Sequence, residues 1–247
     1  MKRQTRQGKV YFVGAGPGDP ELLTIAAANM LARADCIVYA GSLVHQDILR
    51  HAAGHARLVD SAPLDLQEIT DILIAEVRRG RTVVRLHSGD PSLYGAIAEQ
   101  MDVLRRRRIP YAVIPGVSSV FAAAAALGIE YTLPERTQTL ILTRRAGRTP
   151  VPERESLSAL AAHRSSMAIF LSAAMIAEVV RELIAGGYPA KTPAAVVYRA
   201  SLPDQRIITG TLATIADRCR NAGISRQALI IAGDAVRRKT NAASRLY

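Results

Sequence analysis

The sequence predicts an α/β protein of two domains, each a mainly parallel sheet flanked by helices. Short β-branched runs alternate along the chain with longer segments of helical periodicity, a pattern typical of parallel sheets covered on both faces. The 247 residues are enough for two cores, and Pro115-Gly116 marks a junction between them. We therefore expect an N-terminal α/β domain over 9–114, a C-terminal α/β domain over 115–236 and a basic tail over 237–247.

The N-terminal half begins with a strand, after which Asp19 and Pro20 are expected to start a helix. Aspartate is a good N-cap, and proline suits the first helical position because no backbone N–H is needed there. A further helix is expected from the capping-box pair Asp65 and Glu68 as far as Gly80, which ends it. The strands expected in this half span residues 10–13, 36–39, 82–86 and 111–114.

The C-terminal half shows the same alternation of short strands and amphipathic helices. It opens with an expected helix over 118–127, and further helices are expected over 173–185 and 211–220. A polar loop over 144–154, which carries several arginines, follows the first strand of this half. The strands expected here span residues 139–143, 167–171, 194–198, 206–208 and 228–232.

Composition excludes several classes of protein. Hydrophobic residues make up 49% of the chain and charged residues 21%, a globular mixture that argues against disorder. The longest strongly apolar run, 120–127, is far shorter than the roughly 20 residues of a membrane-spanning helix, and no signal-peptide stretch is found. Cys36 and Cys219 lie far apart, without the spacing of a zinc site or a redox pair. We therefore expect a cytoplasmic protein with no membrane partner and no metal site.

The net charge of +11 comes mostly from arginine. The planar guanidinium recognises carboxylates and phosphates through paired hydrogen bonds. The charge therefore fits a polyanionic small molecule, a nucleic acid, or simply a need for solubility. Aromatic residues are only 4% and tryptophan is absent, which weakens the case for base stacking on single-stranded nucleic acid.

Two glycine-bearing loops each follow a predicted strand. The first, Gly14 to Pro20, lies where a dinucleotide-binding fold places its glycine-rich turn, but Asp19 stands in place of the third glycine. An acidic residue there opposes a pyrophosphate, so nicotinamide binding is disfavoured. The second loop, Ser88 to Pro91, would emerge at the same carboxyl edge of the sheet, where open parallel sheets bind ligands. Together the loops predict a pocket, although Asp90 alone is also compatible with a simple helix cap.

These loops also carry a family resemblance. In their order along the chain, the motifs resemble those of tetrapyrrole (corrin/porphyrin) methyltransferases from about Lys9 to about Val236. Within that family, two runs, Tyr39 to Val44 and Leu86 to Ala96, resemble the branch that methylates precorrin-4 at C-11. The motifs that carry the family resemblance are Gly14 to Pro20, Ser88 to Pro91, Pro115 to Ser119, Ala200 to Arg206 and Thr209 to Leu212.

The resemblance implies a homodimer that binds S-adenosylmethionine in a cleft between its two α/β domains. The reaction implied is methyl transfer to C-11 of precorrin-4, a polycarboxylate tetrapyrrole of cobalamin biosynthesis, giving precorrin-5 and S-adenosylhomocysteine. Leu171 stands where relatives often have methionine, which keeps an apolar contact without the thioether. The cofactor contacts implied are Pro17, Ser88, Gly89, Asp90, Leu93, Ser118, Ser119, Leu171, Ala200 and Ala228.

Methyl transfer from a sulfonium needs no covalent enzyme intermediate, and the sequence offers no nucleophile set or metal cluster with recognisable spacing. No base stands out, and Asp19, His87, Asp90 and Tyr94 are candidates only by proximity to the two loops. Substrate carboxylates are expected to meet Arg85, Arg144, Arg145 and Arg199. Three alternatives remain open. They are a related enzyme acting on another precorrin or on uroporphyrinogen III, a nucleic-acid binder, and a cofactor-binding module without catalysis.

Overall fold

The computed structural model describes residues 8–237, and the chain forms two compact units. Unit 1 extends to Ser119 and unit 2 begins at Val120, a few residues after the expected junction at Pro115-Gly116. Apart from Arg237, the expected basic tail over 237–247 lies outside the described residues. The cleft expected between the two domains remains a prediction.

Unit 1 contains a five-stranded sheet in which all neighbouring strands are parallel, in the order β3-β2-β4-β1-β5. The four predicted strands are confirmed, and one strand, β3, was not expected. Its Arg57-Leu58-Val59-Asp60 segment lies at the sheet edge and is mostly exposed, so it lacks the apolar pattern of a buried strand. The strands are β1 (Lys9–Gly14), β2 (Cys36–Tyr39), β3 (Arg57–Asp60), β4 (Thr82–His87) and β5 (Tyr111–Ile114).

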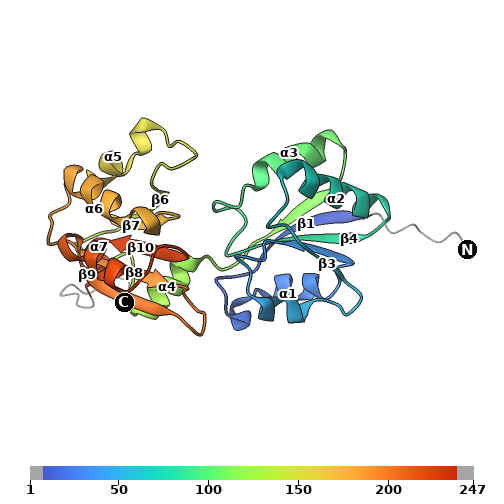
Figure 1. The fold of residues 1–247 in the computed structure, drawn as a ribbon, viewed down its shortest axis with the longest axis horizontal. Helices are drawn as coiled ribbons and strands as arrows, with labels where there is room; N and C mark the ends of the chain where they lie inside the picture. The colour runs from blue at the N-terminus through green and yellow to red at the C-terminus, as the bar shows by residue number, and fades with distance from the viewer. Residues whose placement is uncertain (1–7, 238–247) are drawn as a thin grey trace, which may run out of the picture. The chain divides into compact units, whose positions relative to one another are not determined.

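Helices cover both faces of this sheet (Figure 1). On one face, α2 (Leu66–Arg78) and α3 (Ile97–Arg106) pack against Phe12 and its neighbours. On the other face, α1 (Ile25–Leu31) and the short 3-10 helix η2 (Gln46–His51) pack against Ile37. The crossovers leaving β1 and β4 therefore lie on opposite faces of the sheet.

The expected helix start at Asp19 is wrong in one respect. Asp19 caps only a 3-10 turn, η1 (Pro20–Leu22), through a 2.9 Å hydrogen bond from the amide of Glu21. The backbone then extends at Leu23, and α1 begins after Thr24, whose hydroxyl accepts a hydrogen bond from the amide of Ala27 at 3.1 Å. The extended Leu23 therefore separates the turn at Asp19 from the helix that was expected to start there. The capping box that starts α2 is confirmed, with both reciprocal hydrogen bonds at 2.9 Å.

Unit 2 also contains a five-stranded sheet, in the order β6-β7-β10-β8-β9. The expectation of a mainly parallel sheet is wrong here, because only the β6–β7 pair is parallel. The link 199–205 is too short for a parallel crossover, so β9 returns antiparallel beside β8, and β10 runs in the same reversed direction. The strands are β6 (Leu140–Arg144), β7 (Ser166–Phe170), β8 (Pro193–Tyr198), β9 (Arg206–Thr211) and β10 (Ala228–Ala232).

Helices also cover the two faces of this second sheet (Figure 1). One face carries α4 (Ser119–Leu127). The other carries α5 (Leu157–Ala161), α6 (Ile176–Ala185) and α7 (Leu212–Asn221). The 3-10 helices η3 (Glu153–Glu155) and η4 (Ala173–Met175) precede α5 and α6 in the chain, while η5 (Asp234–Val236) packs through Ala235 on the α4 face. Over residues 8–237, no helix has both the length and the apolar character needed to cross a membrane.

Candidate functional site

The loops that follow β1 and β4 are joined by their backbones. The amide of Gly89 donates to the carbonyl of Gly16 at 2.7 Å, and the amide of Gly16 donates back to Gly89 at 3.2 Å. Because the crossovers from these adjacent strands leave to opposite faces, this is the switch point where open α/β sheets bind ligands. The structure thus brings together the two glycine-bearing loops that the sequence singled out.

The loop that follows β5 also contacts the loops that follow β1 and β4. One carboxylate oxygen of Asp90 accepts a hydrogen bond from the amide of Gly116 at 2.9 Å. A Cβ atom added at Gly116 would lie 2.2 Å from the carbonyl oxygen of Gly89 and 2.7 Å from the Cα of Gly14. Only glycine permits this approach, so the three motif loops form one tightly packed edge.

Space remains beside Gly89. Its φ of +65° is in the left-handed region, yet an added Cβ would meet only backbone atoms of Ser118 and Ser119, 3.8 and 4.0 Å away. A ligand placed here would contact the backbone of the loop. This fits the expectation that S-adenosylmethionine meets this loop largely through backbone groups. Leu93 lies in the same loop, where its amide donates to the carbonyl of Asp90 at 3.2 Å.

In unit 2, the remaining expected cofactor contacts share one end of the sheet. Leu171 follows β7, Ala200 follows β8, and Ala228 opens β10 in register with Tyr198. Leu171 has a φ of +55° and is 71% exposed, and Arg199, next to Ala200, has a φ of +48°. Left-handed non-glycine residues cost about 1–2 kcal/mol each and cluster at functional sites. This end of the sheet is therefore the candidate ligand-binding end of unit 2.

The environments of Asp90 and His87 do not suit a general base. Burial would raise the pKa of Asp90, but hydrogen bonds from Ser92 and from the Gly116 amide outweigh it and hold that pKa below its ordinary range. Both carboxylate oxygens of Asp90 are thereby engaged in holding the loops. Burial, helped by the nearby charge of Arg85, lowers the pKa of His87 to about 3, so its imidazole is neutral.

Two further candidates for a base, Asp19 and Tyr94, lie on the two loops themselves. Asp19 caps the 3-10 turn after β1, as described above. Tyr94 is 41% exposed and has a φ of +57°, in the left-handed region that non-glycine residues seldom adopt. A role for either residue as a base remains a prediction.

Arg85 is buried rather than open to a ligand, with only 7% of its surface exposed. Its guanidinium donates to the carbonyl of Val38 at 3.2 Å and to the hydroxyl of Ser61 at 3.0 Å, and burial lowers its pKa to about 10. The side chain therefore ties β4 to the ends of β2 and β3. Contact between Arg85 and a substrate carboxylate remains a prediction.

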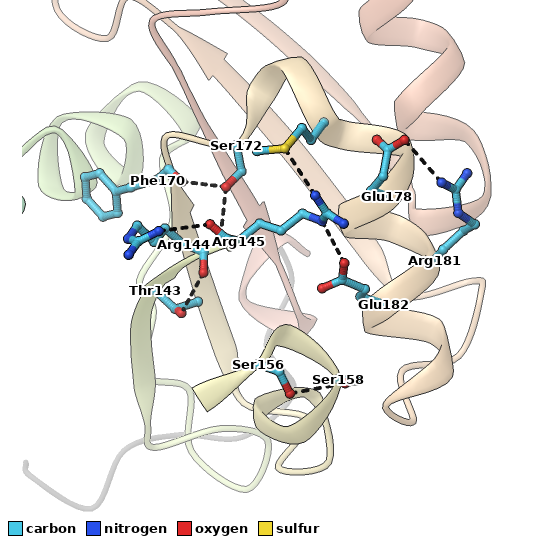
Figure 2. Close-up of polar contacts among 11 residues, drawn as sticks. Thr143, Arg144, Arg145, Ser156, Ser158, Phe170, Ser172, Glu178, Arg181 and Glu182 are labelled. Atoms are coloured by element: carbon cyan, nitrogen blue, oxygen red, sulfur yellow. Dashed lines mark hydrogen bonds and ion pairs between the residues drawn. The ribbon is translucent and has the colours of Figure 1, made fainter. Parts of the chain in front are cut away.

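Arg144 and Arg145, at the end of β6, already have internal partners (Figure 2). The Arg144 guanidinium donates to the carbonyls of Thr149 and Pro150, each at 3.0 Å, and so folds its own loop back. The Nε of Arg145 lies 2.6 Å from a carboxylate oxygen of Glu182 on α6. These internal contacts occupy guanidinium groups that were expected to meet substrate carboxylates.

Arg199 is likewise paired, with Asp204 at 2.7 Å and with Gln227 at 3.1 Å. By contrast, Arg148 is exposed and has no hydrogen bond or ion pair to its side chain among residues 8–237. It lies in the loop that Arg144 holds. Arg148 was not among the expected substrate contacts, although its place in the arginine-rich loop over 144–154 was visible in the sequence.

Within the described part of the chain, no three His, Cys, Asp or Glu side chains are grouped as a metal site would require. Both cysteines are buried free thiols, and burial raises the pKa of each to about 11. Neither thiol is therefore activated as a nucleophile. The candidate residues of the two units, each taken by itself, offer backbone groups, apolar side chains and arginines.

Comparisons with known proteins agree on one family. The model of the Tetrapyrrole (Corrin/Porphyrin) Methylases matches residues 9–216. The Cobalt-precorrin-4 C(11)-methyltransferase of Methanocaldococcus jannaschii is 53% identical, over 97% of this chain and 92% of that protein. The Precorrin-4 C(11)-methyltransferase of Pseudomonas aeruginosa is 49% identical, over 96% of this chain and 94% of that protein.

Solved structures give the same result. The X-ray structure of a cobalt precorrin-4 methyltransferase matches with a TM-score of 0.91 and 44% identity, over 96% of this chain and 99% of that one. A uroporphyrin-III C-methyltransferase from Thermus thermophilus, complexed with S-adenosylhomocysteine, matches with a TM-score of 0.78 and 30% identity, over 93% and 94% of the two chains.

Proposed function

The chain belongs to the tetrapyrrole (corrin/porphyrin) methylase family, and we propose that it transfers a methyl group from S-adenosylmethionine to C-11 of precorrin-4 in cobalamin biosynthesis, giving precorrin-5. The observation that carries this proposal is the joining of three motif loops at the switch point of unit 1. The choice of C-11 rests on relatives of that activity at 53% and 49% identity over nearly the whole chain. The uroporphyrin-III enzyme, at 30%, makes another ring position the second candidate.

The residues proposed to hold the cofactor present mainly backbone and apolar groups. In unit 1 these are the open backbone at Gly89 and the facing Ser118 and Ser119, with Pro17, Ser88, Asp90 and Leu93 beside them. In unit 2 we propose contacts from Leu171, Ala200 and Ala228. A relative with bound S-adenosylhomocysteine supports the identity of this cofactor.

Bound S-adenosylmethionine supplies an electrophilic methyl group on its sulfonium sulfur. The chain's contribution is then to hold the macrocycle carbon in line at near-attack distance and to limit competing water. Exposed apolar side chains such as Leu171, and the ring of Tyr94, are suited to exclude water. Asp90 serves in this proposal to hold the loops rather than to accept a proton.

Substrate carboxylates are proposed to meet Arg148, because its guanidinium is exposed and without an internal partner among the described residues. Arg144 supports this role indirectly, since its hydrogen bonds to Thr149 and Pro150 fix the loop just beyond Arg148. A charge-assisted contact of this kind contributes on the order of 1.5–3 kcal/mol. We further propose a cytoplasmic homodimer, as the family resemblance implies.

The first experiment is calorimetric titration of the purified protein with S-adenosylhomocysteine at two salt concentrations. Saturable binding near one site per chain, little changed by salt, is the expected result. Absence of binding would contradict the cofactor assignment, and salt-sensitive binding of nucleic acid in its place would favour the nucleic-acid alternative.

The second experiment is a methyl-transfer assay with three substrates, namely precorrin-4, cobalt-precorrin-4 and uroporphyrinogen III. Methylation at C-11 of either precorrin, located by mass spectrometry and NMR of the product, is expected. Turnover of uroporphyrinogen III alone would favour the second candidate. Cofactor binding without turnover of any of the three would favour a binding module that lacks catalysis.

A further inference from the structure

Ser172 is completely buried at the end of β7, and its hydroxyl ties two backbone segments together (Figure 2). It donates a hydrogen bond to the carbonyl of Phe170 at 2.7 Å and accepts one from the amide of Arg145 at 3.0 Å. Phe170 ends β7 and Arg145 directly follows β6. One side chain therefore fastens the loops that leave two neighbouring parallel strands.

Leu171 lies between Phe170 and Ser172, the two residues that the first of these hydrogen bonds joins. Its φ of +55° is unfavourable for a non-glycine backbone, and 71% of its surface is exposed, which is unfavourable for an apolar side chain. A leucine stays in the left-handed region only where its surroundings enforce it. The hydrogen bond from Ser172 to Phe170 closes across Leu171 and supplies that constraint.

Arg145, whose backbone amide donates to Ser172, is itself held by contacts of its side chain. Its Nε is 2.6 Å from Glu182 on α6, and its guanidinium also donates to the sulfur of Met175 at 3.2 Å. The Arg145 side chain is thus anchored on the helical layer while its backbone amide holds Ser172. The Arg145 guanidinium is thus engaged by Glu182 and Met175 within unit 2.

We propose that Ser172 is a positioning residue which, locked by Arg145, holds Leu171 outward for an apolar contact with the adenosyl cofactor. The proposal rests on the proposed function, since Leu171 is a cofactor contact only there. In this arrangement Leu171 makes the contact, while Ser172 and Arg145 act through it. The strain at Leu171 is then the means by which an apolar side chain is presented before the ligand arrives.

The test compares Ser172→Ala with the wild type by calorimetry and by steady-state kinetics. Losing one buried hydroxyl is expected to weaken S-adenosylhomocysteine binding about tenfold. The KM for S-adenosylmethionine should rise by a similar factor, while kcat and the KM for the tetrapyrrole change little. Hydrogen exchange of the 170–172 amides should become faster. Ser158→Ala is the control, because Ser158 is an exposed residue of α5 whose hydroxyl has its hydrogen bond, among residues 8–237, with Ser156 at 3.3 Å. It should leave all five quantities unchanged.

A double-mutant cycle with Leu171→Gly separates positioning from general destabilisation. Glycine adopts a positive φ without strain and has no side chain to present, so Ser172→Ala should have no further effect on binding in that background. An equal loss of binding in both backgrounds, or wild-type affinity in Ser172→Ala itself, would overturn the proposal and leave the proposed function standing. Failure of the wild type to bind S-adenosylhomocysteine would instead overturn the proposed function, and this inference with it.

Discussion

The carboxylate of Asp90 accepts a hydrogen bond from the backbone amide of Gly116 at 2.9 Å, and this contact fastens the loop after β4 to the loop after β5. The second carboxylate oxygen accepts hydrogen bonds from the amide and the hydroxyl of Ser92. An aspartate that the sequence offered as a helix cap or a base is in fact a connector between two motif loops.

Asp90→Asn should therefore lower the affinity for the cofactor more than it lowers the free energy of unfolding. One side of the amide becomes a donor, so the variant cannot satisfy both Gly116 and Ser92. We expect a roughly 10- to 100-fold weaker affinity for S-adenosylhomocysteine, in line with the loss of a hydrogen bond to a charged group. Calorimetry measures this directly. Ser92→Ala keeps the Gly116 contact and should lose much less, so equal losses in the two variants would argue against the connector role.

Arg148→Gln should raise the KM for the tetrapyrrole about tenfold or more while leaving the affinity for S-adenosylhomocysteine unchanged. The reason is that Arg148 is exposed, without an internal partner in residues 8–237, and lies in the loop after β6. Arg164 is a matched control, because it is also exposed and precedes β7 at the opposite end of the same sheet. If Arg164→Gln raised the KM equally, overall charge would explain the effect.

His87 should make the folded protein sensitive to mild acid. Burial, aided by the Arg85 charge, lowers its pKa from 6.5 to about 3, so below pH 6.5 the unfolded chain takes up a proton that the folded chain does not. The stability is therefore unaffected above pH 6.5 and falls progressively as the pH drops from 6.5 towards 3. At pH 5 the loss is about 2 kcal/mol. Urea unfolding at pH 7.5 and pH 5 should show this extra loss in the wild type and not in His87→Gln.

Glu76 is a buried carboxylate in unit 1 that forms ion pairs with three arginines. Its side chain is 1% exposed and pairs with Arg57, Arg79 and Arg81 at 2.8, 2.9 and 2.5 Å. Burial would raise its pKa, but the arginine hydrogen bonds and charges outweigh it and lower that pKa below the ordinary range. Glu76→Gln should reduce the free energy of unfolding by about 2 kcal/mol. Glu99→Gln, at an exposed position on α3, should change the melting temperature little.

The sequence predicted correctly those elements whose local sequence pattern is strong. The strands β2 and β5 match their expected bounds, because each is a short β-branched run between loop residues. The meeting of the Gly16 and Gly89 loops was also predictable, since the carboxyl ends of parallel strands share one edge. Local pattern and strand direction were enough for these features.

Other features depend on partners far apart in the sequence. The reversed direction of β10 depends on which strand it pairs with, and its own apolar run carries no such information. The sequence could not show that Arg145 is engaged internally while Arg148 is exposed. The partner of Arg145 is Glu182, which belongs to a helix much later in the chain. The exposed, left-handed Leu171 was likewise invisible, since leucine has no preference for that conformation.

Gly89→Ala tests the space that unit 1 offers to the cofactor. A Cβ at Gly89 would meet only backbone at 3.8 Å or beyond, so the protein itself tolerates it sterically, but the methyl group would occupy the position proposed for the ligand. Gly128→Ala is the matched control, because Gly128 has a φ of +63°, against +65° at Gly89, and nothing lies within 4 Å of its added Cβ. Both variants should lose a similar stability of about 1 kcal/mol from the left-handed backbone. Only Gly89→Ala should also lose S-adenosylhomocysteine binding, because only there would the added methyl group occupy the proposed ligand position. Equal binding by the two variants would place the cofactor away from this loop.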